Sequence, residues 1–297
     1  MFRNSDFGFR ISRLRLRRLR DCRWRASRLK CAFPIMPFAP PIGPARHDQE
    51  VLWDREAWDR KPLLREIYRD FYCKIAAQVE PTKPEPIVEI GSRLGRIKDV
   101  LPSCITTDLQ RHSWLDRQEN AYALSFEAAS LSHLILFDVW HHLQFPGRAL
   151  TEFNRVLVPG GRLIMLEPAI SWLGRFTYGL LHYEPVALGK PITWDAPSGF
   201  DPHNVSYYSA QGNPTRTFWW GEDAGRLAGW RVCDVQPIVS LAYFATGGFS
   251  RPQIGGRRLF RCIQSVEKLA ALAPRIFASR LLVVLEKDDP APRHPGT

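Results

Sequence analysis

The segment that most constrains the fold of this chain is an apolar strand that runs into an acid and two glycines, Val88-Glu89-Ile90-Gly91-Ser92-Arg93-Leu94-Gly95. A glycine loop directly after a strand is how many nucleotide-binding sheets begin. Asp108 closes the next strand-like run and stands 19 positions after Glu89, close to the spacing of ~20 residues at which a second-strand acid meets a ribose diol. Together the two signals predict an adenosine site.

Short apolar runs alternate with helical stretches along the rest of the chain. A strand is expected at each of 87–90, 104–107, 122–124, 134–137, 162–165, 230–239 and 280–286, and a helix at each of 50–79, 146–158, 222–228 and 264–272. Strands that alternate with helices favour parallel pairing. The pattern therefore predicts an α/β fold with a doubly wound, mostly parallel, seven-stranded sheet.

Two of the expected helices carry clear signals. Apolar residues recur every four positions from Leu63 to Ile75 among charged ones, which predicts an amphipathic helix that acts as a lid or flank of the sheet. The helix at 146–158 starts at a proline and stops at Pro159-Gly160-Gly161, so both of its ends have the residues expected there.

The chain divides into a basic tail with a proline-rich linker, residues 1–46, and one domain, residues 47–297. Of the formal net charge of +11, +9 lies within residues 1–35. Four interpretations of this segment are open: a disordered tail or a start codon assigned too early, an organelle transit peptide, an arm for nucleic acid or acidic membranes, and a packed helix. Irregular aromatic-, glycine- and proline-containing segments predict cap insertions near 170–220 and 240–263 of the domain.

Composition argues against several classes of protein. Beyond residue 35 the chain is almost neutral, at about +2, so there is no electrostatic case for a nucleic-acid partner. The six cysteines form no CxxC pair and have no histidines at metal-ligand spacing, so we expect no metal and no disulfide framework. No apolar run approaches the ~18 residues of a membrane-spanning helix. These features predict a soluble, cytoplasmic protein.

Five motifs follow one another between Pro86 and Pro168. They are Glu89 to Gly95, the acid Asp108, Asn120-Ala121-Tyr122-Ala123-Leu124-Ser125-Phe126, Ser132 to Leu143, and Arg155-Val156-Leu157-Val158-Pro159-Gly160-Gly161. In this order they resemble the class I methyltransferases that use S-adenosylmethionine, in particular the small-molecule group called type 11. Each motif alone is weak evidence, but the ordered set is specific. The resemblance implies a Rossmann-like fold with an inserted cap and S-adenosylmethionine as cofactor.

The resemblance also implies which residues hold the cofactor. They are Glu89, Gly91, Ser92, Gly95, Asp108, Asn120, Ala121 and Asp138. The glycines would let the backbone approach the cofactor, Asp108 would accept hydrogen bonds from both ribose hydroxyls, and Asn120 would bond the adenine edge. Glu89 would orient the loop, through backbone amides or the cofactor's amino group. Arg93 and Asn120 depart from the family pattern, which usually has glycine and often aspartate at these positions.

His141 and His142 follow the fourth strand, at the edge where open parallel sheets bind ligands. His142 is the preferred general base on an acceptor, with His141 second. Methyl transfer needs no metal in principle, because the protein has only to align donor and nucleophile, exclude water and manage one proton. His182, Tyr183 and Glu184 in the cap are further candidates to line an acceptor pocket.

We therefore expect S-adenosylmethionine-dependent methyl transfer to a small-molecule, lipid-like or glycan acceptor. A catalytically impaired binding or scaffold protein on the same fold is the main alternative, motivated by Arg93. A nicotinamide-dependent oxidoreductase fits less well, because the loop reads Gly-x-x-x-Gly instead of Gly-x-Gly-x-x-Gly. A nucleic-acid methyltransferase would depend on the basic tail. The sequence specifies neither the methylated atom nor the oligomeric state.

Overall fold

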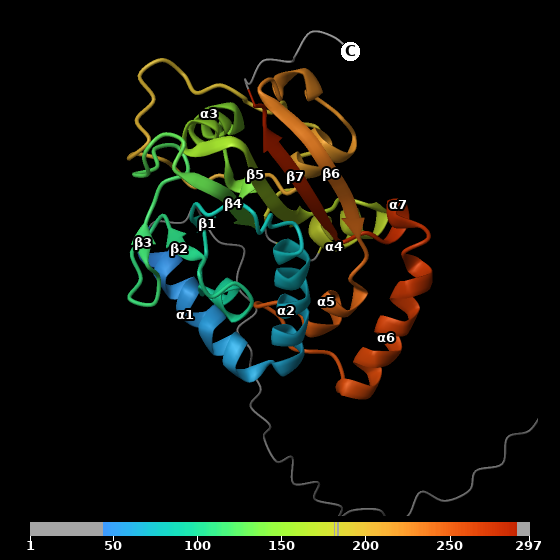
Figure 1. The fold of residues 1–297 in the computed structure, drawn as a ribbon. Helices are drawn as coiled ribbons and strands as arrows, with labels where there is room; N and C mark the ends of the chain where they lie inside the picture. The colour runs from blue at the N-terminus through green and yellow to red at the C-terminus, as the bar shows by residue number, and fades with distance from the viewer. Residues whose placement is uncertain (1–43, 181, 183, 290–297) are drawn as a thin grey trace, which may run out of the picture. The chain divides into compact units, whose positions relative to one another are not determined.

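One seven-stranded sheet forms the centre of the computed structural model, which describes residues 44–180, 182 and 184–289 (Figure 1). The strand order is β3-β2-β1-β4-β5-β7-β6, and neighbouring strands are parallel except where β7 is one of the pair. The strands are β1 (Ile87–Ile90), β2 (Ile105–Asp108), β3 (Arg117–Gln118), β4 (Leu131–Phe137), β5 (Leu157–Pro168), β6 (Trp230–Ile238) and β7 (Arg280–Lys287). The predicted α/β fold with a mostly parallel seven-stranded sheet is confirmed.

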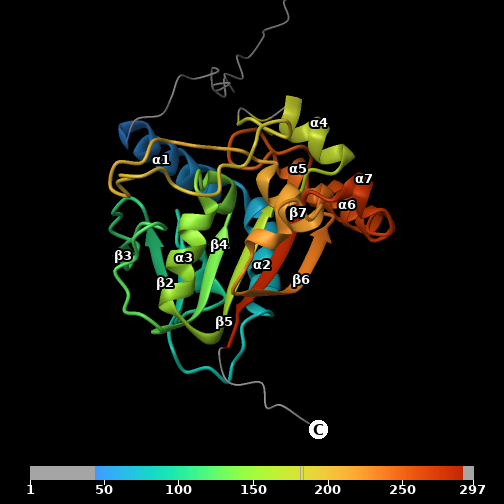
Figure 2. The same cartoon turned by 90° about the horizontal axis from the view of Figure 1, so that it is seen from above.

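Side chains of the central strands alternate between two hydrophobic cores. Leu134, Leu136 and Met165 pack on the face covered by α3 (Pro146–Val156), whereas Ile135 and Ile164 pack on the face covered by α2 (Pro62–Ala76). Figure 2 shows α3 and α2 on opposite sides of the sheet. Both faces of the sheet are thus buried, as parallel strands require.

The other helical elements surround this centre. They are α1 (Pro44–Arg60), α4 (Trp172–Leu180), α5 (Leu241–Thr246), α6 (Arg257–Ala270), α7 (Pro274–Phe277), the 3₁₀ turns η1 (Arg96–Asp99), η2 (Trp140–His142) and η4 (Ala224–Arg226), and the π-helical turn η3 (Thr215–Trp219). The single helix predicted at 50–79 is instead two helices, α1 and α2. The chain breaks before Pro62, because proline lacks the backbone N–H that would continue α1.

The strand predicted at 122–124 is wrong. This segment forms only an isolated bridge, and β3 lies earlier in the chain. Its backbone amides find acceptors on side chains, since Leu124 N donates to Glu152 at 2.8 Å and Ser125 N donates to Glu119 at 2.8 Å. Carboxylates thus replace the hydrogen bonds that a neighbouring strand would provide.

Two further helix predictions need correction. The helix at 222–228 is only the turn η4, preceded by Asp223 at a φ of 61°. The helix expected at 264–272 begins much earlier, at Arg257, so most of the insertion near 240–263 consists of α5 and α6. The helix at 146–158 is confirmed, but it ends at Val156 because Leu157 is extended and begins β5.

The described residues include no helix long and apolar enough to cross a membrane. The basic segment and most of the linker, residues 1–43, lie outside the described residues, as does Tyr183.

Candidate functional site

The glycine loop follows the carboxyl end of β1 and is hydrogen-bonded to the carboxyl end of β2. Gly91 and Gly95 have φ values of 72° and 66°, which glycine adopts without strain. Ser92 ties the two strands together, because its N donates to Thr107 O at 2.7 Å and its hydroxyl accepts Thr107 N at 3.1 Å. The Ser92 side chain therefore supports the loop, and its predicted contact with a cofactor stays a prediction.

Glu89 lies beneath this loop and is 1% exposed. Burial raises the pKa of its carboxyl from 4.5 to about 7, although the nearby Ser92 and Tyr72 hydroxyls lower it. Neither hydroxyl makes a well-aligned hydrogen bond with it, and both carboxylate oxygens lack a partner among the described residues. A buried acid without a partner is costly, so Glu89 is suited to a cationic ligand group.

The side chains of Asp108 and Asn120 both form hydrogen bonds with backbone groups of the protein. Asp108 is 5% exposed, and its Oδ2 accepts Arg93 N at 2.9 Å. Asn120 accepts Tyr122 N at 2.9 Å and donates from Nδ2 to Pro202 O in the cap at 2.5 Å. Each carboxylate oxygen has two lone pairs, so Asp108 can still accept a hydroxyl. Ala121 packs against the core on the α3 face.

Arg93 ties the glycine loop to α1. Its φ is 49°, in the left-handed region that favours glycine. Its guanidinium pairs with the buried carboxylate of Asp54, which α1 contributes. Burial raises the pKa of Asp54 to about 6, and the attraction of Arg93 opposes that rise. The helix α1 is therefore held against the loop by a charge pair.

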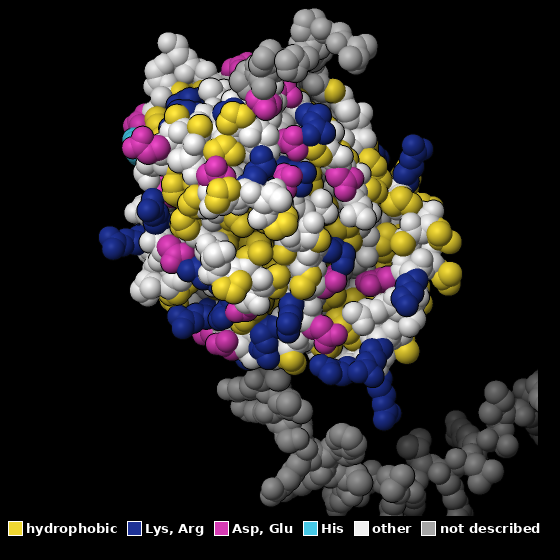
Figure 3. Space-filling model, viewed as in Figure 1, with side chains coloured by type: hydrophobic (Ala, Val, Ile, Leu, Met, Phe, Trp, Pro, Cys, Tyr) yellow, Lys and Arg dark blue, Asp and Glu magenta, His cyan; other side chains and the backbone are white. Residues whose placement is uncertain are grey.

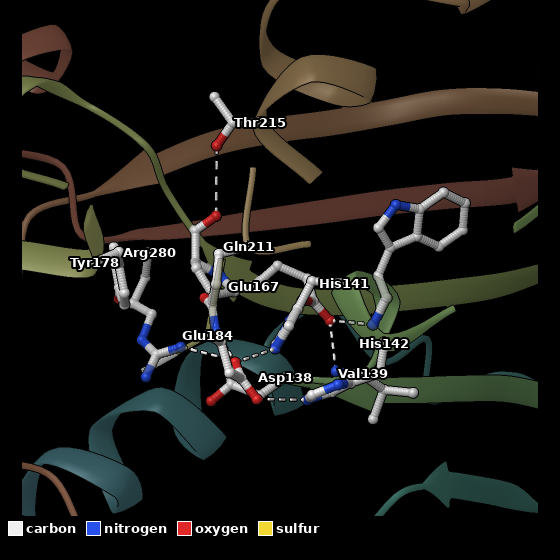
Figure 4. A network of polar contacts seen from close by, with 12 residues as sticks. Asp138, Val139, His141, His142, Glu167, Tyr178, Glu184, Gln211, Thr215 and Arg280 are labelled. Atoms are coloured by element: carbon white, nitrogen blue, oxygen red, sulfur yellow. Dashed lines mark hydrogen bonds and ion pairs between the residues drawn. The ribbon is translucent and has the colours of Figure 1, made fainter. Parts of the chain in front are cut away.

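A second polar cluster follows β4 and β5. His141 is 2% exposed, and its Nδ1 lies 2.7 Å from Glu167 Oε2 (Figure 4). The other oxygen of Glu167 accepts the backbone N–H groups of Val139 at 2.8 Å and Trp140 at 2.7 Å. Glu167 therefore fixes the turn η2 and the orientation of the His141 ring together.

Glu184 brings the cap to the two histidines. Its oxygens lie 3.6 Å from His141 Nε2 and 3.7 Å from His142 Nε2. Tyr207 donates its hydroxyl to Oε1 of Glu184, and Gln211 donates its amide to Oε2. His142 is held from its other side, because its Nδ1 lies 2.9 Å from Tyr208 O. Three segments distant in sequence, at 141–142, 184 and 207–211, thus meet around one carboxylate.

The histidines of this cluster have opposite pKa shifts. Burial by itself lowers the pKa of His141, but the attraction of Glu167 and Glu184 outweighs burial and raises it to about 10. Burial, followed by repulsion from His141, lowers the pKa of His142 to about 4. The His142 side chain is 33% exposed, so solvent moderates this lowering. Without a ligand, His141 carries the proton and His142 is neutral.

Asp138 follows β4 directly, and its carboxylate forms an ion pair with an arginine of β7. It has a φ of 58° and pairs with the guanidinium of Arg280, which is 1% exposed at the start of β7. Its predicted contact with a cofactor stays a prediction, and its carboxylate already compensates a buried cation.

The predicted site residues therefore form two groups at one edge of the sheet. The glycine-loop group gathers around β1 and β2, and the histidine group gathers around β4 and β5. The sequence did not point to Glu167, Gln211 or Arg280 as members of the second group. A signal existed for Glu167, since an acid at the carboxyl end of a parallel strand faces the ligand edge.

The glycine-loop group fits S-adenosylmethionine. The unpartnered carboxylate of Glu89 suits the amino group of the methionine part. A Cβ at Gly91 would lie 2.5 Å from Val139 Cγ2, so the loop packs closely against Val139 and favours glycine at this position. Asp108 has acceptor capacity left for ribose hydroxyls.

Comparison with known proteins gives a consistent result. A family model described as a methyltransferase domain matches residues 99–165, and no curated protein matches. A chain of the Haloferax volcanii complex of the Trm112 methyltransferase activator with a methyltransferase is 15% identical, with 82% of this chain and 96% of that chain covered and a TM-score of 0.47.

Two other solved structures are similar at the same low level. A SAM-dependent methyltransferase from Thermotoga maritima is 16% identical, with 76% and 91% of the two chains covered and a TM-score of 0.45. An S-adenosylmethionine-dependent methyltransferase from Mesorhizobium loti is 12% identical, with 72% and 96% covered and a TM-score of 0.40. Likeness at this level says nothing about the acceptor.

The strand order and the doubly covered sheet define a class I, Rossmann-like methyltransferase fold. Within that class, residues 99–165 are similar to a family model described as a methyltransferase domain.

Proposed function

We propose that this chain transfers the methyl group of S-adenosylmethionine to a small-molecule, lipid-like or glycan acceptor. The observation that carries the proposal is the buried, unpartnered carboxylate of Glu89 beneath a glycine loop, at the same sheet edge as the histidine cluster. When bound, S-adenosylmethionine supplies an electrophilic methyl group on a sulfonium. The residues of the protein have to bind the cofactor, orient it toward the acceptor and exclude water from the site.

The glycine-loop group would hold the cofactor. Glu89 would bind its amino group, and Asp108 would accept hydrogen bonds from its ribose hydroxyls. Gly91 and Gly95 would allow the backbone to approach it, while Asn120 would bond the adenine edge. Ser92, Ala121 and Asp138 complete the proposed set. The Arg93–Asp54 pair holds α1 beside this group and would help to exclude water.

The histidine group would handle the acceptor. The carbonyl of Tyr208 can only accept, so Nδ1 of His142 must donate to it and the lone pair stays on Nε2. That nitrogen is suited to take the proton of an acceptor hydroxyl or amine. His141, fixed between Glu167 and Glu184, is the second candidate.

An aromatic hollow beside the end of β5 supports an acceptor with apolar surface. It has a volume of about 440 Å³ and is lined by Ile170, Ser171, Trp172, Arg175, Trp219, Trp220 and Arg275. The outer face of α4 adds Trp172, Phe176 and Leu180, which are 68%, 56% and 70% exposed. Figure 3 shows hydrophobic side chains among basic ones at the edge of the molecule over α6. Exposed aromatic surface of this kind is typical of binding sites.

The direct test is binding of S-adenosylmethionine to the full chain by calorimetry. We expect one site, and we expect Asp108→Ala to weaken binding at least about tenfold, since it removes a charge-assisted ribose contact. Asp99→Ala is the matched control, because Asp99 is exposed on η1 near the same loop. Absence of binding, or equal effects of the two variants, would contradict the proposal.

The scaffold alternative is favoured by one observation, the charge pair that Arg93 forms with Asp54 in place of a loop glycine. It predicts that S-adenosylmethionine binds but that no methyl group moves to any member of a broad panel of lipids, glycans and small molecules. Transfer of label from a methyl-labelled cofactor to any acceptor of that panel would exclude this alternative.

We also keep the cytoplasm as the proposed location and a small molecule, not nucleic acid, as the partner. The four cysteines within the described residues are free thiols, which is consistent with a reducing compartment.

A further inference from the structure

We infer that His141, His142 and Glu184 form a binding site for one divalent transition-metal ion of the zinc class. The ligating atoms of these three side chains all lie within 4.8 Å of one another. The inference goes beyond methyl transfer, because metal binding requires neither a cofactor nor an acceptor.

The distances between the side chains match metal ligation better than hydrogen bonding. Glu184 oxygens lie 3.6 Å from His141 Nε2 and 3.7 Å from His142 Nε2. Hydrogen bonds of this type are about 2.7–3.2 Å long. Two atoms that each lie about 2.0–2.1 Å from a tetrahedral zinc ion are roughly 3.4 Å apart. Oε2 of Glu184 is the oxygen near His141 and Oε1 the oxygen near His142, and the ligand atoms would have to contract from within 4.8 Å of one another to roughly 3.4 Å to surround an ion.

The hydrogen-bond partners of the two rings lie at Nδ1 and leave each Nε2 atom beside Glu184. His141 Nδ1 bonds the Glu167 carboxylate, and His142 Nδ1 bonds the Tyr208 carbonyl. When an ion displaces the Nε2 proton of His141, each ring keeps its proton on Nδ1 and each Nε2 can ligate the metal. Histidines that bind zinc usually donate their other ring N–H to a carboxylate or a backbone carbonyl in this way.

The charge balance of the cluster favours a dication. Arg280 compensates Asp138, and without an ion the proton of His141 offsets one of the two negative charges of the buried carboxylates Glu167 and Glu184. A dication that displaces this proton would balance both charges. Two nitrogens and one carboxylate are the ligands of zinc, cobalt and nickel, whereas magnesium prefers oxygen alone. The three protein ligands leave a fourth position for water or an acceptor oxygen. His142 is the exposed member through which that position is reached.

The same nitrogen of His142 cannot act as a free base and as a ligand. With a metal bound, the ion itself would lower the pKa of an acceptor hydroxyl, and the base role proposed for His142 would pass to it. The site therefore also defines an acceptor class, namely molecules with an oxygen that can join the ligand shell.

The test uses tag-free, chelator-treated full-length protein without S-adenosylmethionine. Titration with Zn²⁺ by calorimetry should show one ion per chain, and Co²⁺ should give the visible bands of a four-coordinate ion. His142→Ala should weaken Zn²⁺ binding at least about tenfold. Glu167→Gln should weaken it about 10- to 100-fold, because it replaces the carboxylate that orients the His141 ring. His203→Ala, an exposed histidine of the cap, is the matched control and should bind as the unmodified protein does.

Absence of Zn²⁺ binding, or equal Zn²⁺ binding by His142→Ala and the unmodified protein, would overturn the inference. Glu167, His141 and Glu184 would then be a network of ion pairs without a metal. Should His142→Ala fail to fold, the Co²⁺ spectrum of the unmodified chain decides by itself, since four-coordinate bands must appear. Loss of cofactor binding in the separate calorimetric test would refute the proposed function without touching the metal site.

Discussion

Arg280 at the start of β7 and Asp138 at the end of β4 form an ion pair in the interior of the protein. The side chain of Arg280 is 2% exposed and that of Asp138 is 32% exposed. The rings of Tyr243, Phe71 and Phe137 surround the guanidinium, with their centroids 4.5, 5.5 and 5.7 Å from its carbon. Asp138 is therefore the carboxylate that compensates a cation which cannot lose its proton.

Removing that carboxylate should strongly destabilise the fold. We expect Asp138→Ala to lower the free energy of unfolding by about 3–5 kcal/mol, because it leaves a buried charge unpaired. Asp138→Asn should cost less, since asparagine keeps an acceptor and tolerates the positive φ. Asp195→Ala is the control, because Asp195 is 81% exposed in its pair with Arg226 and should change stability by less than about 1 kcal/mol. Denaturant unfolding measures all three, and equal losses for Asp138→Ala and Asp195→Ala would contradict the expectation.

The glycine loop gives a second prediction with an internal control. Gly91 and Gly221 both have positive φ, at 72° and 74°, but only Gly91 has a neighbour where a Cβ would stand. Gly221→Ala should cost about 1–2 kcal/mol from backbone strain alone. Gly91→Ala should cost about 1–3 kcal/mol more, because its Cβ meets Val139 Cγ2.

Adding Val139→Ala to Gly91→Ala should recover the part that is due to this clash. Thermal and denaturant unfolding of the single and double variants measure the stability that is recovered. If Gly91→Ala is no worse than Gly221→Ala, the loop does not pack against Val139 as described.

Glu89 predicts a pH dependence of stability. Its pKa is raised from 4.5 to about 7 in the folded chain, mainly by burial, with Asp108 adding repulsion and the Ser92 and Tyr72 hydroxyls opposing the rise. For an acid with a raised pKa, ionisation disfavours the folded state, so stability falls as pH rises from about 4.5 to about 7 and stays lower above that.

Glu89→Gln cannot ionise, so its stability relative to the unmodified chain should rise by about 3 kcal/mol between pH 4 and pH 8. Urea unfolding across this range measures the difference, and Glu127→Gln, at an exposed position, should show no such trend. A difference for Glu89→Gln that is flat with pH would show that Glu89 ionises as freely in the folded chain as in the unfolded one.

Much of the fold was predictable because local patterns report burial. The apolar runs located the buried parts of β1, β2, β4, β5 and β7, and the four-residue recurrence from Leu63 to Ile75 located the buried face of α2. The strand β6 was also predicted, although only its end residues Trp230 and Ile238 are buried. The segment 122–124 misled because it is buried like a strand, with Tyr122 and Leu124 at 4% and 5% exposure. Its amides bond to carboxylates instead, and burial alone does not distinguish the two cases.

The positions of the glycine loop, of the acid at the end of β2 and of the two histidines after β4 were determined by the sequence itself, because each lies in or directly beside a strand that the local pattern locates. Only the tertiary structure decided that His141 lies in one polar cluster with Glu167, Glu184 and Arg280. These residues lie on β5, the cap and β7, as far as 139 positions from His141, and no local periodicity links them. These charged side chains come together only when the cap folds onto the sheet and β7 pairs with it. A sequence pattern within one segment does not predict such contacts between segments.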